Sequence, residues 1–429
     1  MLEKSNIAFF CCVNKIILDN CILQLSFFVV FQHSFNKGMY NTFKLAHVAH
    51  FLHKLRGKTT SFLGKLLTIT HLGVTIYNTK ICNRAKMLAQ RGITMDTQNK
   101  KVVFSGVQPT GKITLGNYLG AIKNWAPLQD EYNCLYCVVD LHSITVQQVP
   151  AELRKNTMDL VALYIACGVD PNKSILFIQS HVPQHAELAW TLDTISYIGE
   201  LNRMTQFKEK SRKHADNLNM GLMNYPVLMA SDILLYQTDL VPVGKDQIQH
   251  LELARDLAER FNNRYSPTFV VPEGLVYKSG SSIKSLQDPT AKMSKSDPNE
   301  NAIITLFDTP DEIRRKFKRA VTDSETCVRF DADAKPAISN LLTIYSLTSG
   351  ESIADAEKRF EGVGYGVFKE AVADAVIAVI EPIQQEQKRL IADKAYLESV
   401  LKQGAESAER IARKTLTKVY RKIGFIPKF

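Results

Sequence analysis

Acidic residues are almost missing from the first 94 positions of this 429-residue chain, which hold only Glu3 and Asp19 beside 12 lysines and arginines. A basic, acid-poor N-terminus is typical of an organelle transit peptide. Met95 precedes the first organised segment as an initiator would, so translated upstream sequence is the alternative, and a functional domain is a third. From residue 95 onward, 41 basic residues balance 41 acidic ones. A polyanion would therefore have to bind a local patch.

Long hydrophobic runs are also missing. A bilayer span needs ~20 apolar residues, and the apolar N-terminal stretch is interrupted by Asp19, Asn20 and Gln24. We therefore expect no membrane partner and a cytoplasmic protein, or a mitochondrial or plastid one if residues 1–94 are a transit peptide. A composition of 45% hydrophobic and 22% charged residues is ordinary for an enzyme-sized globular protein of two or three domains.

The eight cysteines lack the spacing of a metal site. Cys134 and Cys137 are three positions apart, but they lie in an apolar, strand-like run, and no second Cys or His pair follows at zinc-finger spacing. We predict buried free thiols in a reducing compartment and no metal site.

A glycine-rich loop, GVQPTGKITLGN at 106–117, matches the nucleotide-binding P-loop motif GxxxxGK[ST] at every defined position except one. The hydroxyl that would hold Mg²⁺ after the lysine is replaced by Ile113, and an apolar side chain cannot ligate a hard cation. Thr114 can instead cap a helix over Tyr118–Leu128, and Gly116 would let a ligand approach the backbone. The plainer alternative is that Gly116 and Asn117 only shape a turn.

The order of the predicted elements indicates an α/β fold, with a Rossmann-like, doubly wound parallel sheet and a C-terminal helical domain. After Asp297 no strand is predicted; a capping box at Thr309–Glu312 opens a helix over Ile313–Val321, and apolar residues recur at helical spacing from Ala408 to Ile423. The expected domains are the extension 1–94, a catalytic domain 95–298 and a helical bundle 299–429. The predicted strands are Val102–Ser105, Leu135–Asp140, Ser174–Gln179 and Leu240–Val243, and helical runs between them include Ala151–Cys167 and Glu187–Ile195.

A second motif, KMSKS at 292–296, lies in a proline-flanked loop. Its two lysines, Lys292 and Lys295, form a mobile cationic clamp suited to the β- and γ-phosphates of ATP. The alternative is a solvated surface loop.

Together the two motifs resemble the class I aminoacyl-tRNA synthetases, in which TLGN at 114–117 is similar to the HIGH signature and KMSKS is the second signature. Longer matches resemble the tryptophan-specific members of bacterial and organellar type, from about Lys101 almost to the C-terminus. Nothing in residues 1–94 takes part. The matching segments are FSGVQPTG at 104–111, VDLHSIT at 139–145, YIGELNRMTQFKEK at 197–210, MASDILLY at 229–236, VPVGKDQ at 241–247 and AVTDS at 320–324.

This resemblance implies an ATP-dependent ligase. It would activate L-tryptophan with ATP, bound with Mg²⁺, to tryptophanyl-adenylate and pyrophosphate, then transfer it to tRNA(Trp), working as a homodimer. The tryptophan carboxylate is the nucleophile, so catalysis is mostly positioning and electrostatics. The implied catalytic residues are Lys292, Lys295, Thr114 and Asn117. The implied ATP site adds Gln108, Pro109, Thr110, Gly116, Gly244, Lys245, Asp246, Ile283, Met293, Ser294 and Ser296.

We expect Asp232 to bind the indole N–H of tryptophan. It interrupts an apolar run, where a carboxylate needs a hydrogen-bond donor, and the indole N–H can only donate. The alternative is a cap or salt bridge within the fold. His142 is either a further contact or a satisfied core histidine. The ring is expected to lie against Phe104, Met229, Val241 and Val243, with Tyr225 and Gln247 reaching the α-amino group.

One departure from the family's pattern is Lys245, at a position that is often acidic, which puts any side-chain role there in doubt. A tyrosine-specific synthetase and a P-loop enzyme share the nucleotide chemistry, and Ile113 argues against the latter. A non-catalytic RNA-binding relative would lose the lysine clamp, which is present. The expected tRNA contacts are the basic clusters Arg314–Arg319 and Arg410, Arg413, Lys414, Lys418, Arg421 and Lys422.

Overall fold

The computed structural model describes residues 100–111, 113–208, 218–244, 247–275, 283–295 and 297–427, all of which belong to one compact unit, Leu88–Phe429. Residues 1–94 and three residues of the expected nucleotide site, Lys245, Asp246 and Ser296, lie outside the described residues. No helix of the described ranges is both long and apolar enough to cross a bilayer.

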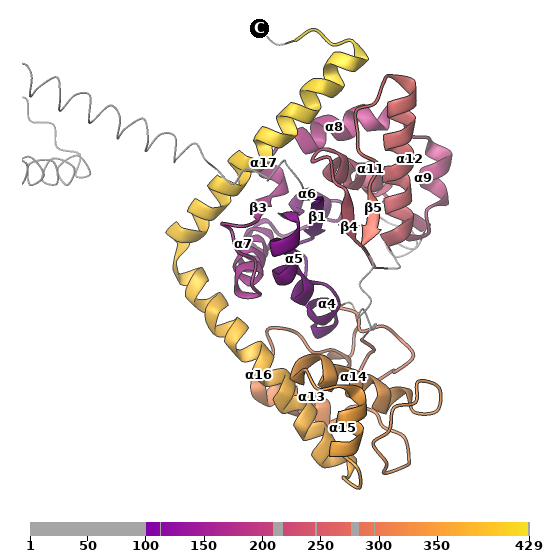
Figure 1. Ribbon diagram of the computed structural model, residues 1–429, viewed down its shortest axis with the longest axis vertical. Coiled ribbons are helices and arrows are strands. Elements are labelled where there is room, and N and C mark those ends of the chain that lie inside the picture. The colour runs from indigo at the N-terminus through magenta and orange to yellow at the C-terminus, as the bar shows by residue number, and fades with distance from the viewer. Residues whose placement is uncertain are drawn as a thin grey trace, which may run out of the picture. The chain divides into compact units, whose positions relative to one another are not determined.

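Five parallel strands form the central sheet, in the order β3-β2-β1-β4-β5 (Figure 1). The chain builds from β1 outward to β3, then returns to the other side of β1 for β4 and β5, so the direction of winding reverses between β1 and β4. Ligands of such sheets bind beyond the carboxyl ends of the strands at this reversal. The predicted α/β fold is confirmed. The strands are β1 (Val102–Val107), β2 (Asn133–Val138), β3 (Ile175–Ile178), β4 (Leu240–Pro242) and β5 (Glu273–Leu275).

Alternate strand residues face two separate cores, as the period of a strand requires. Val103 and Tyr136 belong to the first core with α7 (Pro150–Ala166), whereas Phe104 and Leu135 belong to the second. Helices cover both faces, so β2 and β3 are buried almost throughout, whereas the edge strand β5 is largely exposed. The second core is shared by α8 (Gln184–Asp193), α9 (Ile198–Arg203), α11 (Met220–Leu234) and α12 (Ile248–Arg264). Cys134 and Cys137 are free and buried within β2, as predicted.

The expected helix Tyr118–Leu128 is wrong as a single element. It divides into α4 (Leu115–Gly120), a 3₁₀ turn, η1 (Ile122–Asn124), and α5 (Trp125–Glu131). The backbone leaves helical geometry after Gly120, where φ of Ala121 is −138°. The break lets Trp125 turn inward against Tyr136, with ring centroids 4.8 Å apart.

Beyond β5 the described residues form helices, with one 3₁₀ turn, η5 (Glu300–Ala302). Thr309 and Glu312 make both halves of the predicted capping box, with Pro310 at the first helical position. The helices are α13 (Pro310–Lys318), α14 (Pro336–Ser349), α15 (Ile353–Arg359), α16 (Tyr365–Ala392) and α17 (Lys394–Ile423).

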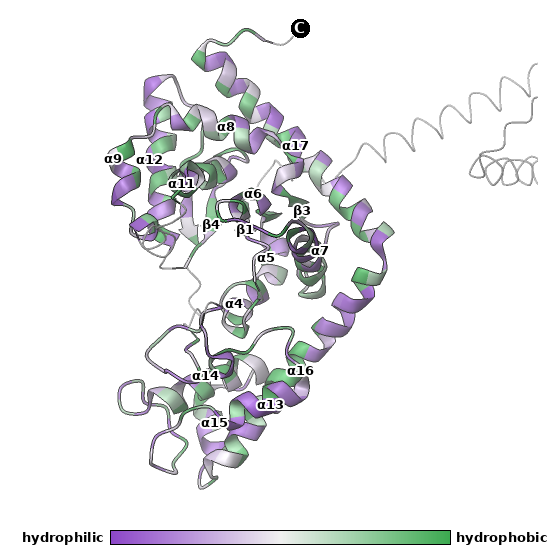
Figure 2. Ribbon diagram, turned by 180° about the vertical axis from the view of Figure 1, so that it is seen from behind, coloured by the Kyte–Doolittle hydropathy of each residue, from purple (hydrophilic) through white to green (hydrophobic). Residues whose placement is uncertain are grey.

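The last helix departs from the predicted bundle, because α17 packs on β3 and α8 of the sheet, while α13, α14 and α16 pack on one another. Hydrophilic and hydrophobic residues alternate in bands along α17, as in an amphipathic helix (Figure 2). Its apolar residues Ala408, Ala412, Leu416 and Val419 lie in the second core. The helical part is therefore tied to the sheet through its last helix.

Candidate active site

The two motif loops meet although 185 positions separate the atoms that touch. The Lys295 ammonium donates to the Thr110 carbonyl at 2.6 Å and contacts the Thr110 hydroxyl at 3.2 Å. Gly111 lies beside the Lys295 side chain and has a φ of +73°, a left-handed backbone conformation that favours glycine. The lysine side chain is exposed, yet desolvation of its ammonium lowers the Lys295 pKa. A cation is thus placed beside the loop that follows β1.

Thr114 and Asn117 hold each other at the start of α4. The Asn117 Oδ1 accepts from the Thr114 N–H at 3.2 Å and from its hydroxyl at 2.9 Å, while the Asn117 N–H donates to the Thr114 hydroxyl at 3.2 Å. Thr114 is buried and Asn117 is exposed. The predicted cap is confirmed, and the group that Asn117 can offer a nucleotide is its Nδ2.

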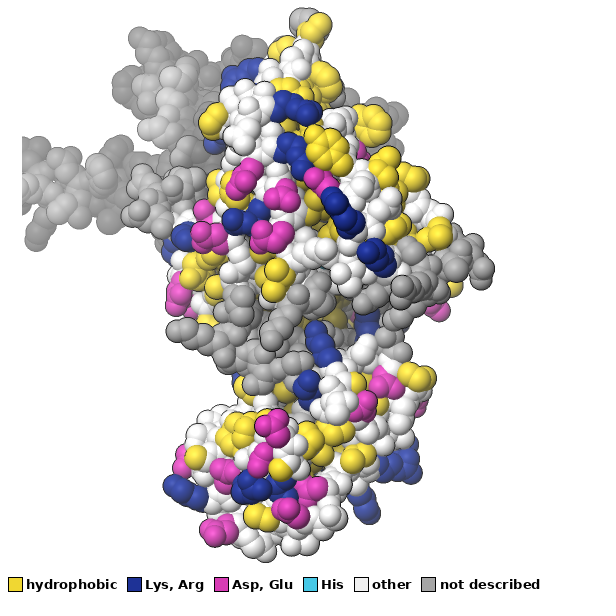
Figure 3. Space-filling model, turned by 90° about the vertical axis from the view of Figure 1, so that its right-hand side faces the viewer, with side chains coloured by type: hydrophobic (Ala, Val, Ile, Leu, Met, Phe, Trp, Pro, Cys, Tyr) yellow, Lys and Arg dark blue, Asp and Glu magenta, His cyan; other side chains and the backbone are white. Residues whose placement is uncertain are grey.

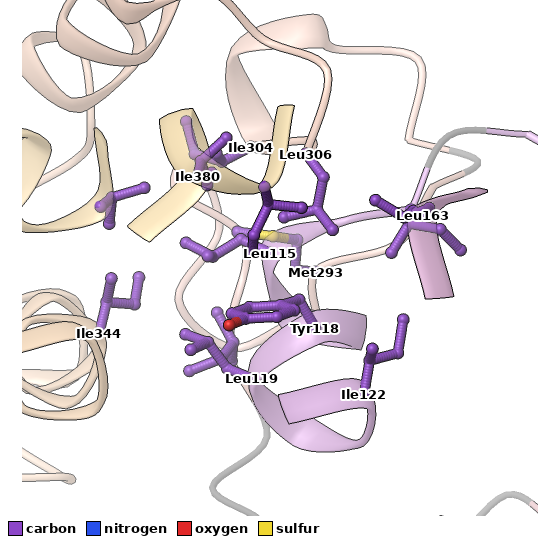
Figure 4. Close-up of a cluster of buried hydrophobic side chains, with 14 of the residues drawn as sticks. Leu115, Tyr118, Leu119, Ile122, Leu163, Met293, Ile304, Leu306, Ile344 and Ile380 are labelled. Carbon is purple, nitrogen blue, oxygen red and sulfur yellow. The ribbon is translucent and has the colours of Figure 1, made fainter. Parts of the chain in front are cut away.

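Gly116 lies close to the loop that carries Lys292 and Lys295, which we call the clamp loop. A Cβ at Gly116 would lie 3.5 Å from Ile283 Cβ and 3.7 Å from Met293 Cβ, and the Met293 N–H donates to the Ile283 carbonyl at 3.0 Å. Met293 is buried together with Leu115, Tyr118, Ile304 and other side chains from α4, α14 and α16 (Figure 4). The clamp loop is therefore anchored by its methionine, with Lys292 and Lys295 exposed on either side.

The helical part supports both loops. The Leu115 N–H donates to the Ile304 carbonyl at 2.8 Å, and Asn340 of α14 bonds both the N–H and the carbonyl of Lys284. Lys316 of α13 forms a buried 2.6 Å ion pair with Asp308, next to this junction. Lys316 is thus removed from the expected tRNA-binding cluster, contrary to prediction.

The remaining expected nucleotide contacts lie at the carboxyl ends of β1 and β4, the reversal point of the sheet. Gln108 is half-buried and Pro109 buried after β1, and Gly244 is exposed after β4. Ser294 is exposed in the clamp loop. Among the described members of this set, the structure joins Thr110 to Lys295 and places Gly116 beside Ile283 and Met293.

Asp232 is the centre of a buried hydrogen-bond network. Its Oδ2 lies 2.8 Å from His142 Nε2, and its Oδ1 lies 2.7 Å from Gln179 Nε2 and 2.6 Å from His185 Nδ1. Burial would raise the Asp232 pKa, but the hydrogen bonds from His142 and His185 outweigh it and leave the pKa lowered. Asp232 is therefore ionised, and the premise that only a substrate donor would satisfy it is wrong. His142 is a partner of this carboxylate.

Apolar and aromatic side chains surround the network. Phe104 and Val241 are buried, and Met229 and Val243 pack partly buried against the same core. The Tyr225 hydroxyl lies 3.0 Å from His250 Nε2, and its ring meets His142 edge-on at 6.4 Å. Gln247 is half-buried at the start of α12.

Three members of the network were missed from the sequence, namely Gln179, His185 and Tyr236. Each is almost fully buried. Gln179 offered one signal, since it directly follows an apolar strand at the edge where ligands of parallel sheets bind. His185 lies among apolar residues of a helix, where a core histidine is the ordinary interpretation.

No group of three or more His, Cys, Asp or Glu residues able to hold a metal ion occurs within the described part of the chain. The positioned groups are instead cations and amides at the two motif loops, and the buried carboxylate of Asp232. This set suits binding of an anionic nucleotide beside an apolar molecule that carries a hydrogen-bond donor.

Comparison with known proteins agrees with this geometry. The family described as "tRNA synthetases class I (W and Y)" matches residues 96–381. A tryptophan–tRNA ligase of Clostridium tetani is 57% identical over 335 residues, which are 78% of this chain and 98% of that protein. The crystal structure of tryptophanyl-tRNA synthetase from Mycoplasma pneumoniae has a TM-score of 0.71 and 37% identity, covering 76% of this chain and 99% of that one. That from Campylobacter jejuni, complexed with ADP and tryptophan, has a TM-score of 0.66 and 34% identity, covering 76% and 100%. The chain therefore belongs to the class I tRNA synthetases of the tryptophan and tyrosine family.

Proposed function

We propose that this chain is a tryptophan–tRNA ligase, which activates L-tryptophan with ATP and transfers it to tRNA(Trp) for protein biosynthesis. The observation that carries the proposal is the contact of Lys295 with Thr110, which joins the two nucleotide motifs into one site. The similarity to the tryptophan–tRNA ligase of Clostridium tetani and to the Campylobacter jejuni enzyme complexed with ADP and tryptophan supports the choice of tryptophan and an adenine nucleotide.

In the first half-reaction, the tryptophan carboxylate attacks the α-phosphorus of ATP. A bond forms between a carboxylate oxygen and that phosphorus, and the bond to the bridging oxygen breaks, so pyrophosphate leaves with the electron pair. Lys292 and Lys295 stabilise the charge that accumulates on it. Mg²⁺ arrives with ATP as part of the substrate.

The rest of the nucleotide site would hold ATP in place. Gln108, Thr110 and the Nδ2 of Asn117 would bind its polar groups, and Gly116 lets it approach the backbone beside Ile283. From the family resemblance, Gly244 and Asp246 would hold the ribose, with Lys245 and Ser296 nearby.

The amino acid would bind at the Asp232 network. A carboxylate has about four acceptor positions, and three are used by His142, Gln179 and His185. The indole N–H would take the fourth. Phe104, Met229, Val241 and Val243 would enclose the ring, and Tyr225 and Gln247 would bind the α-amino group.

The second half-reaction needs a tRNA surface. Exposed basic residues occur on α13 and in a row along α17, and we assign the phosphate contacts to them because the rest of the body is neutral. Lys422 donates to the Pro267 carbonyl, so we assign it a structural role and leave it out of the tRNA surface. The α17 row is Arg410, Arg413, Lys414, Lys418 and Arg421.

The proposal includes a homodimer. Large apolar side chains are exposed on α8, α9 and the start of α11, led by Trp190 at 71% and Ile198 at 69% exposure. The side that carries α9 and α12 shows hydrophobic side chains gathered in its upper part among charged ones (Figure 3). An exposed cluster of this kind marks an interface. Sedimentation analysis of wild type and of Trp190→Glu should show a dimer and its dissociation, whereas a monomeric wild type would contradict it.

A tyrosine-specific ligase is the rival, because the matched family contains both specificities. ATP–pyrophosphate exchange driven by tryptophan or by tyrosine separates them. We expect exchange with tryptophan and little with tyrosine, and the reverse pattern would contradict the proposal. The compartment depends on residues 1–94, and sequencing the N-terminus of the mature protein tests whether they are retained.

A further inference from the structure

We infer that His185 and Tyr236 are positioning residues for amino-acid specificity, which fix the Asp232 carboxylate so that only Oδ2 can accept a donor from the substrate. This inference rests on the proposed function. Neither residue would touch tryptophan, because both act through Asp232.

The hydrogen-bond direction follows from the partners. An ionised carboxylate can only accept, so His185 Nδ1 carries the hydrogen in the 2.6 Å bond to Asp232 Oδ1. The other ring nitrogen, Nε2, lies 2.7 Å from the Tyr236 hydroxyl, so the imidazole is held from both sides. Tyr236 is 1% exposed and His185 0%, so water cannot replace either partner. Tyr236, His185 and Asp232 thus form one continuous buried chain of hydrogen bonds.

Gln179 completes the saturation of Oδ1. Its Oε1 accepts from the Leu141 N–H at 3.0 Å, which fixes the amide orientation and directs Nε2 toward Asp232. Oδ1 therefore accepts from both Gln179 and His185, one for each lone pair. Oδ2 accepts from His142 and has one acceptor position remaining.

The hydrogen-bonded chain of Tyr236, His185 and Asp232, called the relay below, also contacts the expected wall of the amino-acid pocket. The Tyr236 ring stacks on Phe104, with centroids 5.7 Å apart and an interplanar angle of 10°. The Ser231 hydroxyl donates to the His185 carbonyl at 2.7 Å, which ties α8 to the helix that carries Asp232. A change in the relay would therefore alter what Asp232 can recognise as well as where it lies.

A substrate without the indole N–H tests this directly. In β-(3-benzothienyl)-L-alanine a sulfur replaces the N–H of tryptophan with little change in shape. If His185 acts through Asp232, its loss should reduce kcat/KM for tryptophan and spare the sulfur analogue. A general structural role would reduce both alike.

The experiment compares ATP–pyrophosphate exchange with the two amino acids in His185→Leu, His185→Asn and Tyr236→Phe. Leucine removes the donor, whereas asparagine places Nδ2 near the position of Nδ1 and should restore most of the discrimination. Tyr164→Phe is the matched control, because the buried Tyr164 hydroxyl has no hydrogen-bond partner among the described residues. We expect the preference for tryptophan to fall about tenfold or more in His185→Leu, and less in Tyr236→Phe, with KM for ATP unchanged.

The outcomes separate two failures. Wild type without tryptophan-dependent exchange overturns the proposed function, and this inference with it. Active wild type with an unchanged ratio of the two amino acids in Tyr236→Phe and His185→Leu overturns the inference alone. If His185→Leu does not fold, Tyr236→Phe and His185→Asn decide the question, since the first keeps the packed ring and the second keeps a donor for Asp232.

Discussion

Lys295 of the clamp loop donates a hydrogen bond of 2.6 Å to the carbonyl of Thr110, in the loop after β1. A neutral carbonyl is a weak partner for an ammonium whose pKa is lowered by desolvation. Phosphate oxygens are better partners, and their attraction to the ammonium increases most as negative charge develops on the leaving pyrophosphate. The contact therefore predicts where the electrostatic stabilisation of the transition state arises.

Replacing this lysine should impair the chemical step selectively. Lys295→Ala is expected to lower kcat for tryptophan-dependent exchange by ~10²-fold or more, with little change in tryptophan affinity. Lys284→Ala, which removes a nearby ammonium that donates to the Thr290 carbonyl at 3.4 Å, is the control and should be nearly silent. An unchanged kcat in folded Lys295→Ala would contradict the assignment.

The tRNA surface predicts a separation of the two half-reactions. Arg410→Glu with Lys414→Glu should weaken aminoacylation at least about tenfold and flatten its salt dependence, because fewer counterions are released on binding. Exchange without tRNA should be nearly unchanged. Lys394→Glu with Lys402→Glu makes the same charge change elsewhere on α17 and should have a small effect. Equal losses in both half-reactions would indicate a folding defect instead.

The packing of α17 on the sheet depends on Gly404. A Cβ there would lie 1.8 Å from the carbonyl oxygen of Leu176 in β3, so Gly404→Ala must displace the helix. We expect a loss of about 3 kcal/mol or more in the free energy of unfolding, measured by urea denaturation. Gly366→Ala on α16 meets nothing within 4 Å and should be neutral or stabilising. Comparable stability of the two variants would contradict the packing.

Asp193 predicts a pH dependence of stability. Burial raises the pKa of Asp193 to about 6, so between its unfolded value of 3.8 and about 6 the folded state binds more protons than the unfolded state. Its contribution to stability is therefore lost as pH rises through this window. Asp193→Asn keeps an acceptor for Asn224 and should be more stable at pH 7 by about 1 kcal/mol, since solvent screening discounts the shift. Thermal melts at pH 4, 5, 6 and 7 test this, and parallel curves would contradict it.

Local patterns predicted what depends on nearby residues. Four of the five strands were predicted within about two residues, whereas β5 was not predicted. The cap at Thr114 and the capping box at Thr309 were predicted because their partners lie three positions away. The contacts of Asp232 with His185, Gln179 and His142 were not predicted, since these partners lie 47, 53 and 90 residues away in the sequence. The same cause hid the burial of Lys316, whose charge looked available until Asp308 was placed beside it. An apolar stripe on α17 predicted a buried face but could not say that β3 would cover it.

The revised environment of Asp232 also changes the expected size of its effect. A lone carboxylate would reject phenylalanine by ~10⁴–10⁵-fold, because it would be left without a donor. With three donors from the fold, the penalty for a missing indole N–H should be smaller. Tyrosine should also bind poorly, because its ring is smaller than an indole and leaves a void against Phe104 and Met229.

The central claim, that this site reads tryptophan through Asp232, is tested most directly by exchange kinetics with tryptophan and phenylalanine on wild type and Asp232→Ala. We predict that the substitution lowers kcat/KM for tryptophan by ~10²-fold or more and lowers that for phenylalanine much less, so that the gap between them narrows. If the ratio of kcat/KM for tryptophan to that for phenylalanine is the same in wild type and Asp232→Ala, the claim is contradicted and Asp232 has only a structural role.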